Sequence, residues 1–335
     1  MKPETTPVSL LLSLVLILAA GASCAALRRE LPPPVEAPPV EVPPAPPAPT
    51  GPHVLAQGTI EVGRPTTQGF VWIERVGQTD GLHLWRDGAA TQVSQASALS
   101  KLSVLGDRVS WVADSAEVLV LDGDQARPLW RAEGVTLGSA ILDASGGVVA
   151  LGSLPGGAVA LWHLGEHGER TPLPAPTEPL ELVWADAAGV WGAQRGDKPG
   201  LYRLDRAQGV WARVADISYA YPVAQDGRIY WWERVGAPNN PWAYPDRLCS
   251  RALDGSDRVE HRVQDRADGL LPDPDGLTVT DMLDRRGVVF TGPDGAERGR
   301  FVLPNPNSPW VTERVPGGVF WYTPTGIGIE PLSLP

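Results

Sequence analysis

Cysteine is nearly absent from this sequence: Cys24 and Cys249 are the only two among 335 residues. Neither lies in a C-x-x-C pair or at the spacing of metal ligands, so the sequence predicts no zinc site. Cys249 is expected to be a small buried side chain, because free cysteines are usually buried.

Positive charge is scarce as well. The 28 basic residues are outnumbered by 39 acidic residues, which gives a formal net charge of -11. Only three of the basic residues are lysines, namely Lys2, Lys101 and Lys198. Contacts to nucleic-acid phosphates need a basic face, so no nucleic-acid partner is predicted.

Catalytic motifs are also missing. The sequence contains no G-x-S-x-G, no H-E-x-x-H and no phosphate-binding glycine loop. The histidines are scattered: His53, His83, His163, His167 and His261. His163 and His167 are four residues apart, but the sequence HLGEHGE is typical of a surface turn and not of a helical metal pair. We therefore predict no catalytic residue, no metal ligand and no cofactor.

An Asp-rich stretch, PDPDGLTVTD, places Asp273, Asp275 and Asp281 near a glycine. It lacks the third early ligand and the terminal glutamate spacing of an EF-hand calcium loop. We interpret it as a turn.

The N-terminus contains a short apolar run. Residues 8–20, VSLLLSLVLILAA, are thirteen residues without a charge. That length is short for a membrane span and typical of the h-region of a signal peptide. Small residues follow and lead into a cysteine: Gly21, Ala22, Ser23 and Cys24.

This arrangement resembles the lipobox of bacterial lipoproteins. The resemblance implies that the Cys24 thiol is acylated, that residues 1–23 are removed and that the mature chain begins at Cys24. Gly21 stands where the family usually has leucine. Two alternatives stay open: a signal peptide cut at an A-x-A-like site, with Cys24 incidental, and an uncleaved anchor over residues 8–27. If Cys24 carries lipid, Cys249 has no disulfide partner within the chain.

A proline-rich segment follows the cysteine. Residues 31–50 contain ten prolines in twenty residues. Proline lacks an N–H group and has a fixed φ, so the segment is expected to be extended polyproline II. At about 3.1 Å per residue, it would hold a folded domain up to roughly 60 Å from the lipid. A PxxP recognition site is the alternative to this spacer.

These features predict a lipid-anchored, extracytoplasmic protein of the cell envelope. Ala25 follows the cysteine in place of the aspartate that retains many lipoproteins at the inner membrane, which favours the outer membrane. The predicted organisation is a signal peptide over 1–23, a lipidated cysteine and linker over 24–50, and a folded domain over 51–335.

Repeated short strands dominate the folded domain. The 37 Gly and 35 Pro favour short elements joined by turns, and the apolar runs alternate with a period of two. A strand of this kind recurs around seven equivalent positions: Phe70, Val109, Val148, Val190, Ile229, Val288 and Val319. The steps between them are 39, 39, 42, 39, 59 and 31 residues. An insertion accounts for the fifth step.

A second strand follows each of these after a hairpin-length gap, and several such strands end in Asp-Gly, which suits a tight turn. A period near 40 with several strands per unit is typical of β-propeller blades. The predicted fold is therefore all-β, a single propeller of about seven four-stranded blades, with six as the second choice. The strand near residues 54–62 is expected to complete the last blade.

The repeat around Ile229, DGRIYWWERV followed by RLCSRALDGSD, resembles the repeats of TolB-type and YWTD-type propellers. GLYRLD, before it, is similar. The resemblance implies the propeller fold and does not specify a function.

The insertion between Glu233 and Leu248 is the candidate ligand site. Its Asn239, Asn240, Trp242 and Tyr244 combine amides with flat aromatic surface, as in contacts to sugars or peptides. The alternative is a proline-stiffened loop that packs on the rim. The strand tryptophans are expected to lie in the core between blades: Trp72, Trp111, Trp231 and Trp321.

The leading functional hypothesis is a non-catalytic binding or scaffold lipoprotein for an envelope protein or glycan. The alternative is a propeller hydrolase or lyase with a metal ion at the ring centre. A subunit of an outer-membrane assembly machine differs from the first hypothesis only in its partner.

Overall fold

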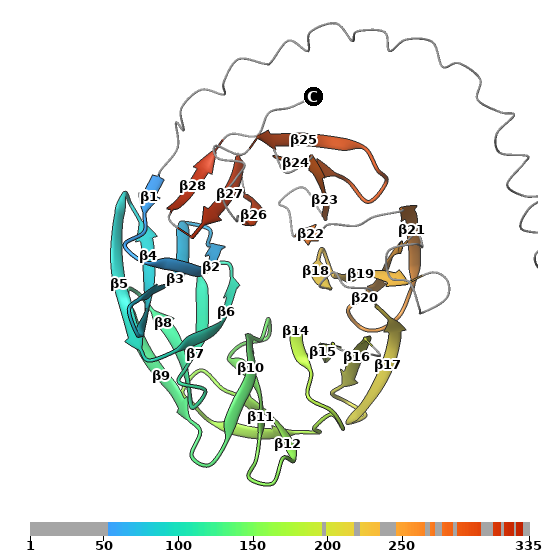
Figure 1. Ribbon diagram of the computed structural model, residues 1–335. Coiled ribbons are helices and arrows are strands. Elements are labelled where there is room, and N and C mark those ends of the chain that lie inside the picture. The colour runs from blue at the N-terminus through green and yellow to red at the C-terminus, as the bar shows by residue number, and fades with distance from the viewer. Residues whose placement is uncertain are drawn as a thin grey trace, which may run out of the picture. The chain divides into compact units, whose positions relative to one another are not determined.

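Strands are the only regular elements in the described part of the chain, which a computed structural model places in one compact unit from Pro46 to Pro335. The described residues are 53–195, 199–217, 222–234, 246–264, 269–271, 277–283, 287–302, 311–315, 318–324 and 326–330. In these ranges, 28 strands form seven four-stranded antiparallel sheets, which we call blades 1 to 7 (Figure 1). The prediction of seven four-stranded blades is confirmed.

Each blade is built from strands in chain order, from the centre of the ring outward. Blade 1 contains β2 (Thr59–Pro65), β3 (Gly69–Val76), β4 (Thr79–Arg86) and β5 (Ala89–Ala96). Blade 2 contains β6 (Leu99–Leu105), β7 (Arg108–Ala113), β8 (Glu117–Asp122) and β9 (Gln125–Arg131). Blade 3 contains β10 (Thr136–Leu142), β11 (Val148–Ser153), β12 (Val159–Leu164) and β13 (Arg170–Leu173).

The remaining blades follow the same order, except at the closure. Blade 4 contains β14 (Glu181–Ala185), β15 (Gly189–Gln194), β16 (Gly200–Asp205) and β17 (Val210–Asp216). Blade 5 contains β18 (Val223–Gln225), β19 (Arg228–Arg234), β20 (Asp246–Ala252) and β21 (Val259–Gln264). Blade 6 contains β22 (Gly269–Leu271), β23 (Thr278–Leu283), β24 (Gly287–Thr291) and β25 (Glu297–Val302). Blade 7 contains β26 (Val311–Val315), β27 (Gly318–Thr323), β28 (Gly326–Glu330) and β1 (His53–Leu55).

Strand β1 closes the ring. It pairs antiparallel with β28, with His53 opposite Gly328 and Leu55 opposite Gly326. Blade 7 therefore combines three strands from one end of the folded region with one from the other, and β28 is not left as a free edge. The expectation that the strand near residues 54–62 completes this blade is correct only for β1, because β2 already begins blade 1.

Seven apolar clusters hold the blades together, and each lies between two neighbours. Val112 of blade 2 packs with Leu142 and Val148 of blade 3, and the last cluster brings Phe70 of blade 1 against Phe320 of blade 7. The other clusters join blades 1 and 2, 3 and 4, 4 and 5, 5 and 6, and 6 and 7. Burial of apolar surface is thus continuous around the ring.

The strand tryptophans lie where the sequence predicts. Trp72, Trp111, Trp231 and Trp321 are at most 4% exposed, and each belongs to a cluster between blades. They are part of the core and offer no exposed ring to a ligand.

The structure of blade 6 corrects one of the seven equivalent positions that the sequence predicts. In the other six blades the proposed equivalent residue lies on the second strand, but Val288 lies on β24, the third strand of blade 6. Val279 on β23 is the true equivalent, and it packs towards blade 5 with Trp232. The irregular steps of 59 and 31 residues then become 50 and 40, from Ile229 to Val279 and on to Val319. Strand β23 reads TVTDML and carries no aromatic residue. The repeat pattern, an apolar strand with an aromatic residue near its end, therefore matched β24, GVVFT, better than β23.

A buried carboxylate joins blade 1 to blade 2. Asp80 on β4 is fully buried, accepts hydrogen bonds from Arg75 at 2.7 and 3.0 Å, and accepts a third from the Leu99 backbone N–H at 2.8 Å. The hydrogen bond from Arg75 is the largest cause that lowers the pKa of Asp80, while burial opposes it. The ionised form of Asp80 therefore stabilises the folded state.

Replacing Asp80 with asparagine is expected to lower the free energy of unfolding at pH 7. Folding lowers the pKa of Asp80, so its ionised carboxylate stabilises the folded state at pH values above the usual carboxyl pKa of about 4. This stabilisation is lost as the pH falls through the pKa that Asp80 has in the folded state. Urea titrations of both proteins at pH 7 and pH 3 measure the difference. The difference in free energy of unfolding between the two proteins should be smaller at pH 3 than at pH 7. An equal difference at both pH values would show that Asp80 does not act through its charge.

Candidate functional site

The predicted ligand loop and the predicted lipid site both fall outside the described residues. Asn239, Asn240, Trp242 and Tyr244 lie in the connection between β19 and β20, and Cys24 lies before β1. These assignments remain predictions. None of the segments that the structure does describe is a helix long and apolar enough to span a bilayer.

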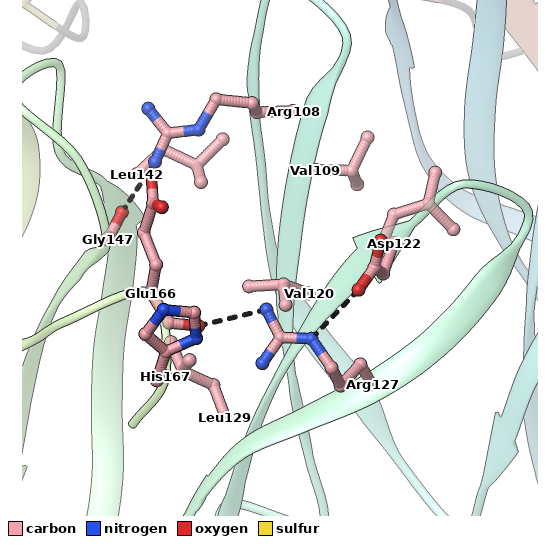
Figure 2. A pocket seen from close by; sticks show the side chains of 11 residues that line it. Arg108, Val109, Val120, Asp122, Arg127, Leu129, Leu142, Gly147, Glu166 and His167 are labelled. Carbon is pink, nitrogen blue, oxygen red and sulfur yellow. Dashed lines mark hydrogen bonds and ion pairs between the residues drawn. The ribbon is translucent and has the colours of Figure 1, made fainter. Parts of the chain in front are cut away.

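A cavity of about 470 Å³ lies in the groove between blades 2 and 3 (Figure 2). Blade 2 contributes β7, β8 and β9, and blade 3 contributes the end of β10 and two turns, one before β11 and one after β12. This volume falls within the usual range for small-ligand sites. The residues that form it come from four strands and two turns, so no local sequence pattern indicates it.

The wall of the cavity is apolar where it meets the core. Val109, Leu129 and Leu142 are buried side chains on β7, β9 and β10. Val120 on β8 is half-buried and packs against the cluster between blades 2 and 3. The same apolar contacts that hold the two blades together therefore give the cavity a rigid lining.

Arg127 on β9 crosses the mouth of the cavity. Its Nε donates to Asp122 Oδ2 at 3.2 Å and its Nη2 donates to the backbone oxygen of Glu166 at 3.0 Å (Figure 2). Asp122 belongs to blade 2 and Glu166 to the turn after β12 in blade 3, so the guanidinium group bridges the groove.

Arg108, at the start of β7, forms a second bridge. Its Nη1 donates to the backbone oxygen of Asp143 at 2.9 Å and its Nη2 to that of Gly147 at 3.0 Å. Both acceptors belong to the turn between β10 and β11 of blade 3. No carboxylate of the described chain pairs with Arg108, so its charge is held by carbonyl dipoles alone and faces the cavity (Figure 2).

The Asp143 side chain holds this turn in place through its own contacts. It is fully buried, accepts from the Ser145 backbone N–H at 2.8 Å, and pairs with Arg206 from blade 4. His163 Nε2 lies 3.5 Å from the same carboxylate. Blades 2, 3 and 4 thus meet at one turn, which holds the Gly147 side of the cavity in place.

The cavity combines an apolar lining with charged groups from both blades. None of its lining residues is Ser, Thr, Cys or Lys, and its two guanidinium groups already have fixed hydrogen-bond partners. Glu166 and His167 are exposed at the rim. An apolar lining beside charged donors can hold a ligand and orient it.

A serine–histidine contact occurs in blade 5. Ser250 Oγ lies 2.8 Å from His261 Nε2, and Arg228 Nε donates to the same hydroxyl at 2.8 Å. Burial, and then Arg228, lower the pKa of His261. Ser250 is fully buried, so a substrate cannot reach its hydroxyl, and we interpret the contact as structural.

Cys249 is a buried side chain, as the sequence predicts. It is fully buried in the cluster between blades 4 and 5, and burial, followed by the nearby Glu233, raises the pKa of its thiol to about 12. The thiol is therefore protonated at neutral pH and is a poor nucleophile.

Metal-ligand residues do not gather in the part of the chain that the structure describes, where no group of three or more His, Cys, Asp or Glu could hold an ion. His163 lies on β12 and not in a turn as expected, whereas His167 does lie in the turn that follows. Asp281 lies on β23, also not in a turn, while Asp273 and Asp275 are outside the described residues.

Comparisons with known proteins identify the fold. No protein-family description and no curated protein matches the sequence. Among solved structures, a prolyl endopeptidase is similar at 13% identity and a TM-score of 0.57, over 79% of this chain and 46% of its own. This chain therefore spans about half the length of that peptidase. An oligogalacturonate lyase in complex with manganese is similar at 10% identity and a TM-score of 0.57, over 85% of this chain and 98% of its own.

TolB from Acinetobacter baumannii also matches, at 10% identity over 84% of this chain and 81% of its own. Its TM-score is 0.44. The other two structures are a peptidase and a lyase. The similarity shows that the chain is a β-propeller and leaves its function to be argued from its own residues.

Proposed function

We propose that this protein is a lipid-anchored, extracytoplasmic propeller that binds an envelope protein or glycan and catalyses no reaction. The observation that carries the binding role is the cavity between blades 2 and 3. It combines an apolar lining with two guanidinium groups, and none of its lining residues is Ser, Thr, Cys or Lys. Propellers are suited to this task, because rigid strands position the loops and grooves that contact a partner.

The sequence before β1 supports the proposed location. An apolar run of signal-peptide length leads into Cys24, and ten prolines in residues 31–50 follow it. A proline-rich spacer would separate the propeller from the lipid surface and leave its faces accessible. We place the protein in the cell envelope, with the outer membrane favoured over the inner membrane.

Filling the cavity tests the binding role. Val120→Trp puts a large side chain into the apolar lining, and we expect it to reduce capture of the partner at least about tenfold, equivalent to about 1.4 kcal/mol. Capture is measured by crosslinking the full-length protein in native envelopes and quantifying the adducts. Val76→Trp is the matched control, because Val76 is 50% exposed on blade 1 and does not line the cavity. Adducts that are equally abundant in both variants would contradict the role of the cavity.

A propeller hydrolase or lyase with a metal ion at the ring centre is the second candidate. The similarity to an oligogalacturonate lyase in complex with manganese favours this candidate. Elemental analysis of the purified full-length protein distinguishes the two. A stoichiometric metal ion together with metal-dependent turnover of a lactone, ester or uronate substrate would support the enzyme and overturn the binding proposal.

A further inference from the structure

Four neighbouring inner strands are bulged at the same place. The pairing of the first strand with the second shifts by one residue in blades 1, 2, 3 and 4. In β2, β10 and β14 the extra residue is Glu61, Gly138 and Val183, and in β6 it falls in the step from Ser100 to Ser103. Bulges bend a strand and redirect side chains, and they are common next to functional sites.

The bulge in β6 contains a lysine in a strained backbone conformation. Lys101 has a φ of 55°, in the left-handed region that side chains other than Gly, Asn and Asp rarely adopt. Five other described non-glycine residues share a positive φ, and all are Asp or Ser in connections between strands. In the described chain, Lys101 alone combines a long side chain, a left-handed backbone and a position inside a strand.

No neighbour compensates the charge of Lys101. Its side chain is exposed, and no hydrogen bond or ion pair to it occurs within the described residues. The acidic residues on the nearby inner strands have other partners: Glu61 on β2 lies 3.7 Å from Arg75, and Glu181 on β14 lies 2.8 Å from Arg195. Lys101 is thus an isolated cation on a strand that borders the centre of the ring (Figure 1).

We infer that Lys101 binds a carboxylate of an acidic peptide segment that lies along β6, the first strand of blade 2. An unpaired ammonium group suits a carboxylate, and backbone strain at a contact residue is typical of functional sites. The neighbouring strands β2, β6 and β10 carry no aromatic residue, so they offer no stacking platform for a sugar. The inference rests on the proposed binding function and adds a protein contact separate from the cavity between blades 2 and 3.

Three substitutions in the full-length protein separate charge from strain. Lys101→Met removes the charge, Lys101→Arg keeps it, and Lys101→Gly removes the charge and relieves the backbone. Poly-L-glutamate is the probe, with affinity measured by calorimetry at low and moderate salt. Arg300→Gln is the control, because Arg300 is an exposed cation on β25, the outer strand of blade 6.

We expect Lys101→Met and Lys101→Gly to bind the probe about three- to fivefold more weakly, with a shallower salt dependence, and Lys101→Arg and Arg300→Gln to bind it as the wild type does. Lys101→Gly should also raise the Tm by about 1 to 3 °C, because glycine adopts this φ without strain. Equal binding by Lys101→Met and wild type, or no rise in Tm for Lys101→Gly, would overturn the inference. Val120→Trp should bind the probe normally, so a failure here is distinct from a failure of the cavity to capture a partner.

Discussion

Replacing Cys24 with alanine is expected to move the protein from the membrane fraction to the soluble fraction. If Cys24 carries a diacylglyceryl group, its acyl chains anchor the protein firmly, because each buried CH₂ contributes about 0.8 kcal/mol. Without the thiol no thioether can form, and the apolar run of residues 8–20 is short for a membrane span. The measurement is the distribution of the protein between sedimented membranes and supernatant.

Cys249→Ala is the matched control for this experiment. Cys249 is fully buried and its thiol is protonated at neutral pH, so its loss should leave the protein in the membrane fraction. The alternatives give different patterns: a cleaved secretory protein is soluble even with Cys24 present, and an uncleaved anchor keeps Cys24→Ala in the membrane. Either pattern would contradict lipidation at Cys24.

Trp111→Ala is expected to be among the most destabilising single changes in the folded domain. The indole is fully buried on β7 and lies in the cluster that joins blades 1 and 2. Truncating a buried tryptophan leaves a large cavity, and the expected loss in the free energy of unfolding is about 3 to 5 kcal/mol. Urea denaturation measures it.

Val210→Ala is a suitable comparison, because Val210 is 57% exposed on the outer strand β17 and should cost less than about 0.5 kcal/mol. A loss below about 1 kcal/mol for Trp111→Ala would mean that the contacts between blades do not hold the ring together.

The second strands explain why the fold could be predicted. Residues such as Phe70 and Val109 face one neighbouring blade, while the residues beside them, such as Val71, face another. Both faces of each blade are buried, so apolar residues recur at nearly every position of the second strand, and the repeat becomes visible. The second strand of blade 6 was not identified in this way, because β23 carries Thr and Asp, whereas β24 is more continuously apolar.

The candidate sites were much harder to predict. Arg108 meets the turn of Gly147, and Arg127 meets the turn of Glu166, only because blades 2 and 3 lie side by side. Nothing in their local sequence distinguishes these two residues from other surface arginines. The backbone conformation of Lys101 is likewise set by the pairing of β6 with β7 and not by its neighbours in the chain. The loop with Asn239 and Trp242 was visible in the sequence as an insertion, and its role stays a prediction.

Crosslinking in intact envelopes tests the binding function most directly. Full-length wild-type protein, Val120→Trp and Val76→Trp are compared under identical conditions, and the discrete adducts are quantified. We predict that wild type and Val76→Trp form the same adducts and that Val120→Trp forms at least about tenfold fewer. Adducts of equal yield in all three proteins, or none in any of them, would contradict a binding site between blades 2 and 3.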